Sequence, residues 1–583
     1  MRQRLDNSSL VRALALVALG LALSVFAWSP MLGAYPHTEG GDGPVFHKML
    51  EAARVSVVRY HELPLWNPYE CGGLPLWDNP QAPLGAPLIW PLYLLGTLPT
   101  MELWLVVHGA IGFVSMWLLT RRELGVSRMA AFVSAGAFAF GGFFQGHLPG
   151  GHFVFASFEY FPLAVLLWRR AERDLRHAIA FGLLVALMIY EGGVYPLPHL
   201  AVLLAIETLT RAWPPRRVAR IALAGAIVIA VALTVGAARF LPVIAQIRSH
   251  TRGVAAEADG LHWGTFKDMF LMRAHERPVA GQRYVWGEYD GYLGPFVLLF
   301  ALAGIALAGI EQWWLIVLLA TSLAFMAGDV GAYAPWTLLR GHVFPFKDMR
   351  VPSRFVLEVS MVLTAFAGLG LDRLAEVARR RLRRVDWRDG VRVALFGVAM
   401  IGVGDVVGVG LTVVASQFGN PPEDTAIVAS PRLYLGSRAP NMIDGPRENL
   451  GRRDCWEEWG FGAGAPLWDG DVPQARAVDD RALVESVTRT QNAFVVDVVA
   501  REPARVLFNT SYDQGWGSSV GNVIEQDKQL AVDVPAGRSH LRVRYRPRGF
   551  VLGVVLTLLG LVGSIGALVW LTRRARALAA GVV

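Results

Sequence analysis

Long apolar runs are the feature that most constrains how this chain can fold. The hydrocarbon core of a bilayer is about 30 Å thick, so a helix that crosses it needs about 20 mostly apolar residues. Runs of this kind lie at 11–33, 101–120, 128–146, 155–168, 178–192, 199–212, 220–246, 291–309, 312–328, 353–371, 393–416 and 549–571. The pattern predicts a mainly α-helical, polytopic membrane protein with about twelve transmembrane helices.

The composition supports this reading. Of the 583 residues, 54% are hydrophobic and only 17% are charged, and the mean hydropathy is +0.39. Soluble domains carry about 25% charged residues, so an ordinary soluble enzyme and a disordered chain are both excluded. The net charge of +8 gives no reason to expect nucleic acid, because excess arginine and lysine mark the cytoplasmic loops of membrane proteins.

Arginine-rich loops set the expected orientation. They lie at 121–122, 169–176, 211–220, 379–384 and 573–576, all on the side of the N-terminus if twelve helices are counted. We therefore expect both termini in the cytoplasm of a bacterial inner-membrane protein. The first run is interpreted as an uncleaved anchor, because it is long and further runs follow it. The segments expected outside include 34–100, 247–290, 329–352 and 417–548.

The segment 417–548 has the pattern of β structure. Residues 493–500 are rich in valine, and Leu541, Val543 and Tyr545 alternate with arginines as in a half-buried strand. We expect a small antiparallel sandwich outside the membrane. The predicted division is a transmembrane module with its outer loops over 1–416, a β-rich domain over 417–548, and a last helix with a cytoplasmic tail over 549–583.

Titratable residues follow the first apolar run. Asp42 lies between two glycines, so the backbone can bring its carboxylate against a substrate, as a general base or a metal ligand requires. Asp42 and Glu39 are the catalytic candidates, and His37, Asp42 and His47 are the candidates for a metal. The alternative is a hydrated turn whose carboxylates are simply solvated.

The next loop, 63–91, is dense in proline, glycine and tryptophan. The ring of Trp66 could stack on a sugar, and Asn67 and Asp78 could bind its hydroxyl groups. The alternative is an interfacial aromatic belt that only anchors the loop.

A basic cluster precedes the tenth run, on the side where the charge rule disfavours it. Lys347, Arg350 and Arg354 could bind the phosphate of a lipid-linked substrate, or they could pair with nearby aspartates or lipid head groups. Glu288 and Asp290 form an acidic edge that could face the same cavity. The alternative is an acidic helix start that the helix dipole favours without any function.

Other polar residues leave two interpretations open. His147, His152, Glu191 and His199 flank glycine- and proline-rich turns, and they either line a cavity or metal site or serve as turn residues. Asp405 lies inside the eleventh run, where an acid is either functional or satisfied by helix packing. Cys71 and Cys455, the only two cysteines, both fall outside the membrane and could be bridged or free.

Several motifs resemble, in order and spacing, those of the bacterial YfhO-type membrane proteins of the GT-C glycosyltransferase superfamily. They are Gly41-Asp42-Gly43, Leu65-Trp66-Asn67-Pro68, Gly72-Gly73-Leu74-Pro75, Gly291-Tyr292-Leu293-Gly294, Arg350-Val351-Pro352-Ser353-Arg354-Phe355, Gly515-Trp516 and Val534-Pro535-Ala536-Gly537. The resemblance runs over nearly the whole chain.

The resemblance implies transfer of a sugar from a polyprenyl-phosphate carrier to a glycan, lipid or protein acceptor outside the cytoplasmic membrane. Asp42 would be the first-loop acid that deprotonates or orients the acceptor, with or without a divalent cation such as magnesium or manganese. The loop has no adjacent acidic pair, since Glu39 stands three residues before Asp42. No other cofactor and no nucleic acid are implied.

Two other classes of protein fit parts of the pattern. A transporter or flippase of lipid-linked saccharides would use the many helices and Asp405, although polar groups gather in the outer loops and the two halves show no clear repeat. A noncatalytic envelope scaffold would use the outer sandwich to recruit partners.

Overall fold

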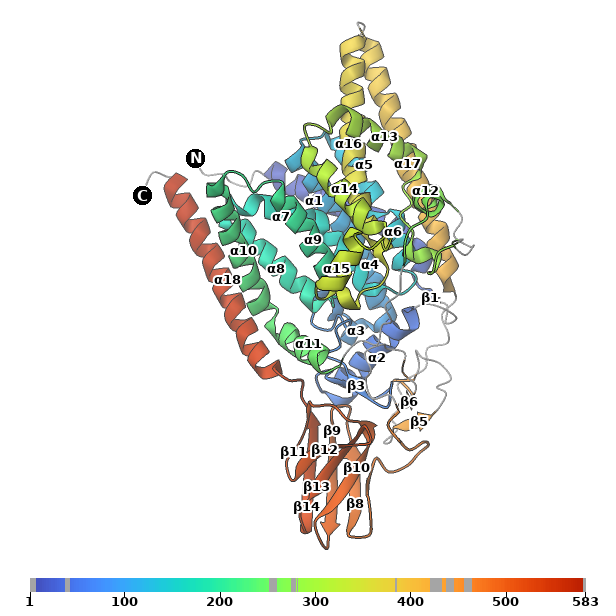
Figure 1. The fold of residues 1–583 in the computed structure, drawn as a ribbon, viewed down its shortest axis with the longest axis vertical. Helices are drawn as coiled ribbons and strands as arrows, with labels where there is room; N and C mark the ends of the chain where they lie inside the picture. The colour runs from blue at the N-terminus through green and yellow to red at the C-terminus, as the bar shows by residue number, and fades with distance from the viewer. Residues whose placement is uncertain are drawn as a thin grey trace.

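Helices make up most of the computed structural model, and strands gather at one end (Figure 1). The structure describes residues 7–36, 42–250, 259–273, 279, 281–382, 385–419, 433–436, 445–453, 455 and 464–579. The helices are α1 (Asn7–Ala27), α2 (Gly43–Tyr60), α3 (Leu92–Leu95), α4 (Thr97–Leu119), α5 (Arg128–Ala139), α6 (Gly142–His147), α7 (Phe161–Ala171), α8 (Leu175–Tyr190), α9 (Pro196–Leu209), α10 (Pro215–Val235), α11 (Ala237–Ser249), α12 (Trp263–Leu271), α13 (Gly294–Ala308), α14 (Trp313–Met326), α15 (Pro335–His342), α16 (Val356–Arg381), α17 (Val385–Gln417) and α18 (Phe550–Ala579).

The chain is a multi-pass membrane protein, as its apolar runs predict. Among the described residues, seven helical stretches are long and apolar enough to cross a bilayer: 10–27, 97–124, 128–147, 215–235, 352–381, 389–417 and 550–578. Four shorter apolar helices, α8, α9, α13 and α14, accompany them. The mainly helical fold class is therefore confirmed.

Three predicted spans are divided in the structure. The span 128–146 is divided into α5 and α6, 220–246 is divided into α10 and α11, and 155–168 is divided as well. Residues 155–168 do not form a single helix, because a 3₁₀ helix, η4 (Phe153–Tyr160), is followed by α7. Pro162 is the second residue of α7. Proline lacks the backbone N–H that a continuing helix would need, and it therefore favours the start of a new helix at this point.

Helix α16 is the best buried of the candidate spans and packs closely on α13. The crossing depends on glycine: a methyl group at Gly304 would lie 2.0 Å from the carbonyl oxygen of Phe366, and one at Gly370 would lie 1.9 Å from that of Phe300. Small residues of this kind let two helix backbones approach in a membrane.

The strands of the C-terminal region form two four-stranded antiparallel sheets. Their orders are β12-β13-β10-β7 and β11-β14-β9-β8. The strands are β7 (Ala475–Ala477), β8 (Ala482–Arg489), β9 (Ala493–Ala500), β10 (Ala504–Ser511), β11 (Trp516–Ser518), β12 (Asn522–Gln526), β13 (Gln529–Val534) and β14 (Gly537–Tyr545). Alternate residues of β14 are buried, as its sequence predicts. Both chain ends lie away from this sandwich (Figure 1).

Short strands connect the remaining segments. β1 (Tyr35–Pro36) pairs with β4 (Phe418–Gly419), β2 (Trp66–Asn67) pairs with β3 (Leu74–Pro75), and β5 (Tyr434–Gly436) pairs with β6 (Leu450–Arg452). The first of these pairs joins the chain after α1 to the chain after α17.

The first outer loop is built into the sandwich. Trp66 is fully buried, and its ring centroid lies 5.1 Å from that of Trp516 and 4.6 Å from that of Tyr545. The side chain of Gln491 donates to the carbonyl oxygen of Trp66 over 2.9 Å. Cys71 and Cys455 form a disulfide bond, which settles the alternative that the sequence left open. The loop and the sandwich therefore make one structural unit.

Candidate functional site

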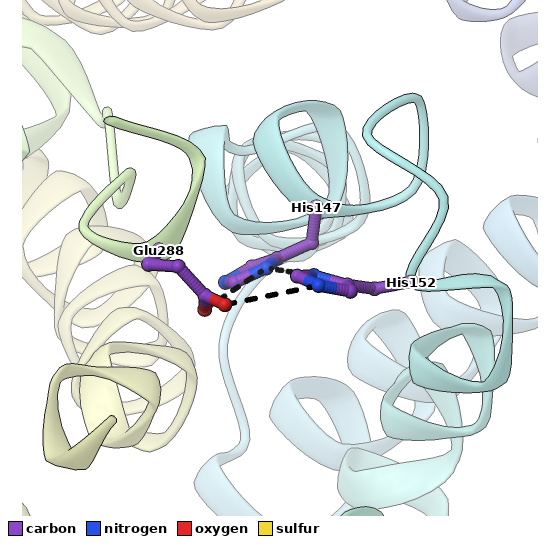
Figure 2. Close-up of side chains that lie close together, drawn as sticks. All are labelled: His147, His152 and Glu288. Atoms are coloured by element: carbon purple, nitrogen blue, oxygen red, sulfur yellow. Dashed lines mark hydrogen bonds and ion pairs between the residues drawn. The ribbon is translucent and has the colours of Figure 1, made fainter. Parts of the chain in front are cut away.

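Polar side chains from segments far apart in the sequence meet where one candidate membrane span, 128–147, ends and another, 352–381, begins. Asp42 precedes α2, His147 ends α6, His152 follows in the next turn, and Glu288 ends η5 (Trp286–Glu288). Arg354 lies in η7 (Pro352–Phe355), directly before α16. Figure 2 shows His147, His152 and Glu288 pointing toward one another.

The turn after α6 brings the first three segments together. The backbone N–H of His152 donates to the carbonyl oxygen of His147 over 3.1 Å, and that of Asp42 donates to Gly150 over 3.0 Å. Gly151 has a φ of 102°, and a methyl group there would lie 2.0 Å from the backbone nitrogen of Gly43. Only glycine combines this backbone conformation with so close an approach.

The side-chain distances define a compact polar cluster. The two Nδ1 atoms of His147 and His152 lie 2.8 Å apart. His147 Nδ1 lies 3.7 Å from Glu288 Oε2, and His152 Nε2 lies 3.7 Å from Glu288 Oε1. His152 Nε2 also lies 3.3 Å from Asp42 Oδ2. His152 therefore stands between the two carboxylates.

Arg354 makes a two-point contact with the carboxylate of Glu288. Its Nε and one terminal nitrogen donate to the two Glu288 oxygens over 2.9 and 2.6 Å. The guanidinium lies over the rings of Phe155 and Tyr195, 4.9 and 4.7 Å from their centroids. Burial opposes ionisation of Glu288, but Arg354 and the neighbouring histidines hold its pKa well below the usual value. Glu288 is thus a permanent anion with a fixed orientation.

Exposure falls from one end of the cluster to the other. The side chain of Asp42 is 41% exposed and that of His152 is 20% exposed, whereas His147 is fully buried. Of the two carboxylates, Asp42 is accessible to a substrate and Glu288 is largely enclosed. An accessible carboxylate beside an imidazole can accept a proton from a bound hydroxyl group.

The structure thus brings together three of the predicted site residues, Asp42, Glu288 and Arg354. Lys347 lies exposed on η6 (Phe346–Asp348), and Arg350 is half-buried between η6 and η7. His37 and Glu39 lie outside the described residues.

His47, a predicted metal ligand, lies inside α2. It is fully buried, and burial lowers the pKa of its imidazole to about 4, while Glu51 and Arg447 act on it from nearby. It does not belong to the cluster formed by His147, His152 and Glu288.

Four of the five predicted substrate-binding residues are buried and contact other parts of the protein: Trp66, Asn67, Asp78 and Asp290. Neither face of Trp66 is available to a sugar, since the sandwich core covers it. Asn67 Oδ1 accepts from the backbone of Tyr69 over 3.0 Å, and Asp78 Oδ2 accepts from the Tyr545 hydroxyl over 2.9 Å.

Asp290 is the fourth. Its Oδ1 accepts from the backbone N–H of Tyr292 over 3.0 Å. Methyl groups at Gly142 or Gly146 would collide with it, so Asp290 packs directly on α6. It supports the helix that carries His147.

The other polar residues that the sequence singled out, Glu191, His199 and Asp405, have partners of their own. Glu191 accepts from Ser157 and Tyr160 over 2.6 and 2.8 Å, and His199 lies 2.9 Å from Glu358. Asp405 pairs with Arg273.

No signal in the sequence revealed that His147 and His152 would meet Glu288. The residues are separated by several helices, and spacing along the chain carries no information about such contacts. The glycines at 150 and 151 were the one local indication of a close approach by another segment.

Comparisons with solved structures give several partial likenesses, of which two are described here. No family model matches the chain, and no curated protein matches it. The arabinofuranosyltransferase AftD from mycobacteria is 16% identical with a TM-score of 0.42, over 68% of this chain and 27% of that one. ArnT from Cupriavidus metallidurans, solved with bound undecaprenyl phosphate, is 16% identical with a TM-score of 0.41, over 77% of this chain and 87% of that one. The chain spans about a quarter of the length of AftD.

Proposed function

We propose that this protein transfers a sugar from a polyprenyl-phosphate donor to an acceptor outside the cytoplasmic membrane. The observation that carries the proposal is the polar cluster itself. An accessible carboxylate, Asp42, lies against His152, and the cluster continues through Glu288 to a guanidinium at the start of a central membrane helix. Acceptor activation and an anionic leaving group need these kinds of side chain.

In the proposed reaction, Asp42 accepts the proton of an acceptor hydroxyl group while that oxygen attacks the anomeric carbon of the donor sugar. The bond between this carbon and the phosphate oxygen breaks, and polyprenyl phosphate leaves with the electron pair. His152 is a positioning residue, because it lies 3.3 Å from Asp42 Oδ2 and fixes the carboxylate from one side.

Negative charge on the departing phosphate needs cations nearby. We assign this role to Lys347 and Arg350, on the loop that leads into η7. Arg354 has two nitrogens engaged with Glu288, so it contributes through its remaining N–H groups and through its charge. The sequence pattern predicted one phosphate-binding role for all three cations. Their surroundings suggest that Lys347 and Arg350 contact the phosphate and that Arg354 mainly orients Glu288.

A membrane setting suits this chemistry. The isoprenoid tail of the donor needs contact with lipid, which a polytopic helix bundle provides and a single anchor does not. The arginine-rich loops suggest cytoplasmic termini, and both chain ends lie away from the sandwich (Figure 1). We place the site on the outer face of the inner membrane, with the β-rich region of 417–548 beside it as the part that selects the acceptor.

Replacement of Asp42 by asparagine tests the proposal. In cells that lack the native copy, lipid-linked sugars and envelope glycans are measured by mass spectrometry. Loss of a general base slows a reaction by about 10²–10⁴, so the Asp42→Asn strain should accumulate a lipid-linked sugar and lose the glycan that receives it.

The matched control is Asp527→Asn, at an exposed turn of the sandwich where asparagine tolerates the positive φ. This strain should resemble the wild type. An unchanged glycan in Asp42→Asn cells would refute the proposal. If Asp405→Asn alone removed the glycan, a transporter would replace it as the better interpretation.

A further inference from the structure

We propose that His147, His152 and Glu288 bind a zinc-type divalent ion and leave its fourth position open on the side of Asp42. Each of the first three residues offers one ligand atom, and these atoms all lie within 4.8 Å of one another. A role of the ion in sugar transfer rests on the proposed function, whereas the binding of the ion to these residues does not.

The distances fit a small tetrahedral site. With metal–ligand bonds of about 2.0–2.1 Å, neighbouring ligand atoms of a tetrahedron lie about 3.3–3.4 Å apart. Here His152 Nε2 lies 3.7 Å from Glu288 Oε1. His147 Nδ1 lies 3.7 Å from Glu288 Oε2.

Glu288 can serve Arg354 and an ion at the same time. A carboxylate has about four lone-pair sites, and Arg354 occupies one on each oxygen. The remaining lone pairs face the two histidines. Arg354 therefore acts as the outer partner that orients a ligating carboxylate, an arrangement common around protein-bound metals.

The surroundings of His147 favour a bound ion. Phe143 and Phe155 enclose its ring, with centroids 4.5 and 5.2 Å away, and these apolar rings exclude water from that side. Asp42 and His152 lie on the accessible side. An ion would thus be held from the protein side and reached by a substrate oxygen from the other, as in a metal site with an open position.

The donor atoms select the type of ion. The sequence suggested magnesium or manganese, which prefer oxygen ligands, whereas two imidazole nitrogens with carboxylates suit zinc. The charges agree with a dication. Asp42 and Glu288 are anionic and Arg354 is cationic, so with neutral imidazoles the cluster carries one net negative charge. A dication reverses that sign and makes the site attractive to a phosphate.

Zinc binding to the full-length protein in lipid nanodiscs tests the inference. The protein is first stripped with a chelator, and zinc is then titrated in competition with a fluorescent chelator and counted by elemental mass spectrometry. We expect one tight zinc ion per chain, at least tenfold weaker binding in His152→Gln, and no displacement by a large excess of magnesium. The control is His540→Gln, which removes a histidine 2.8 Å from Asp497 on the exposed face of the sandwich, and it should bind like the wild type.

A second variant, His147→Gln, keeps the test decisive if His152→Gln does not fold. Equal zinc binding by wild type and a folded histidine variant would overturn the inference, as would displacement by magnesium. Tight zinc binding combined with an unchanged glycan in Asp42→Asn cells would remove the proposed transfer reaction and leave the metal site standing. If the protein did not bind zinc but Asp42→Asn cells lost the glycan, the metal site would be refuted and the proposed transfer reaction would stand.

Discussion

Replacing Asp78 by asparagine should stabilise the folded protein at neutral pH. Asp78 is 2% exposed and lies where the first outer loop meets the sandwich. Burial raises the pKa of its carboxyl group to about 8, and the nearby Asp513 adds to this effect. Because the folded state holds this proton, Asp78 is mostly neutral at pH 7 and accepts from Tyr545 as an asparagine would.

The magnitude follows from the difference in proton binding between the two states. The unfolded chain releases the Asp78 proton near pH 3.8, and the folded chain releases it near pH 8. The contribution of Asp78 to the stability of the folded state is therefore greatest below pH 3.8 and is lost as the pH rises toward 8. At 1.36 kcal/mol per pH unit, the loss is about 2 kcal/mol at pH 5, about 4 kcal/mol at pH 7 and about 5 kcal/mol at pH 8. Asparagine removes this loss and keeps the acceptor oxygen.

The assay is guanidinium unfolding of the full-length protein in detergent, followed by tryptophan emission. Trp66 and Trp516 lie in the adjoining core and report on it. The gain in unfolding free energy for Asp78→Asn should grow from pH 5 to pH 8, whereas Asp527→Asn should show no such gain. A variant less stable than the wild type at pH 8 would refute the reasoning, because Asp78 would then be an anion stabilised by the nearby Arg239.

Three further predictions concern packing. Cys71→Ser should lower the unfolding free energy of the outer region by roughly 2–5 kcal/mol, and a reductant should have the same effect on the wild type but none on the variant. Trp66→Ala should cost about 3–5 kcal/mol in the same unfolding assay, and a smaller loss would mean that the loop separates from the sandwich at little cost. Gly370→Ala should cost about 1–3 kcal/mol or prevent folding, because its methyl group meets the backbone of Phe300, whereas Gly408→Ala, with open space around it, should leave the yield of folded protein unchanged in size-exclusion chromatography.

The fold was largely predictable because both of its patterns are local. A bilayer demands long apolar runs, and a half-buried strand demands alternation, so residues 353–371 and 541–545 reveal their structures without any knowledge of their neighbours. The break at Tyr160 and Phe161 was missed, since average apolarity does not distinguish a 3₁₀ helix followed by a short helix from one continuous span. The structural effect of Pro162 depends on whether it lies at the first turn of a helix or in its interior.

The candidate site was predictable only where chemistry shows in a short segment. Asp42 between two glycines and Arg354 at the start of a helix could be found in this way. Trp66 could not be interpreted correctly, because a tryptophan in an outer loop looks the same whether its ring faces a ligand or fills a core. The answer depended on Trp516 and Tyr545, which lie hundreds of residues further along the chain.

Arg354 explains why two acids so close together can differ in role. Glu288 receives both of the strong bonds from this guanidinium, and its carboxylate is 10% exposed, so its charge is fixed and its oxygens are oriented. Asp42 contacts His152 and lies on the accessible side of the cluster, so its carboxylate can exchange a proton with a substrate. An ion between them would bind most strongly to the oriented acid and would leave the exposed one adjustable. The same cluster can therefore hold a metal and still present a reactive carboxylate. The charge of Glu288 is compensated by Arg354, whereas Asp42 lies beside His152 and can react with a substrate.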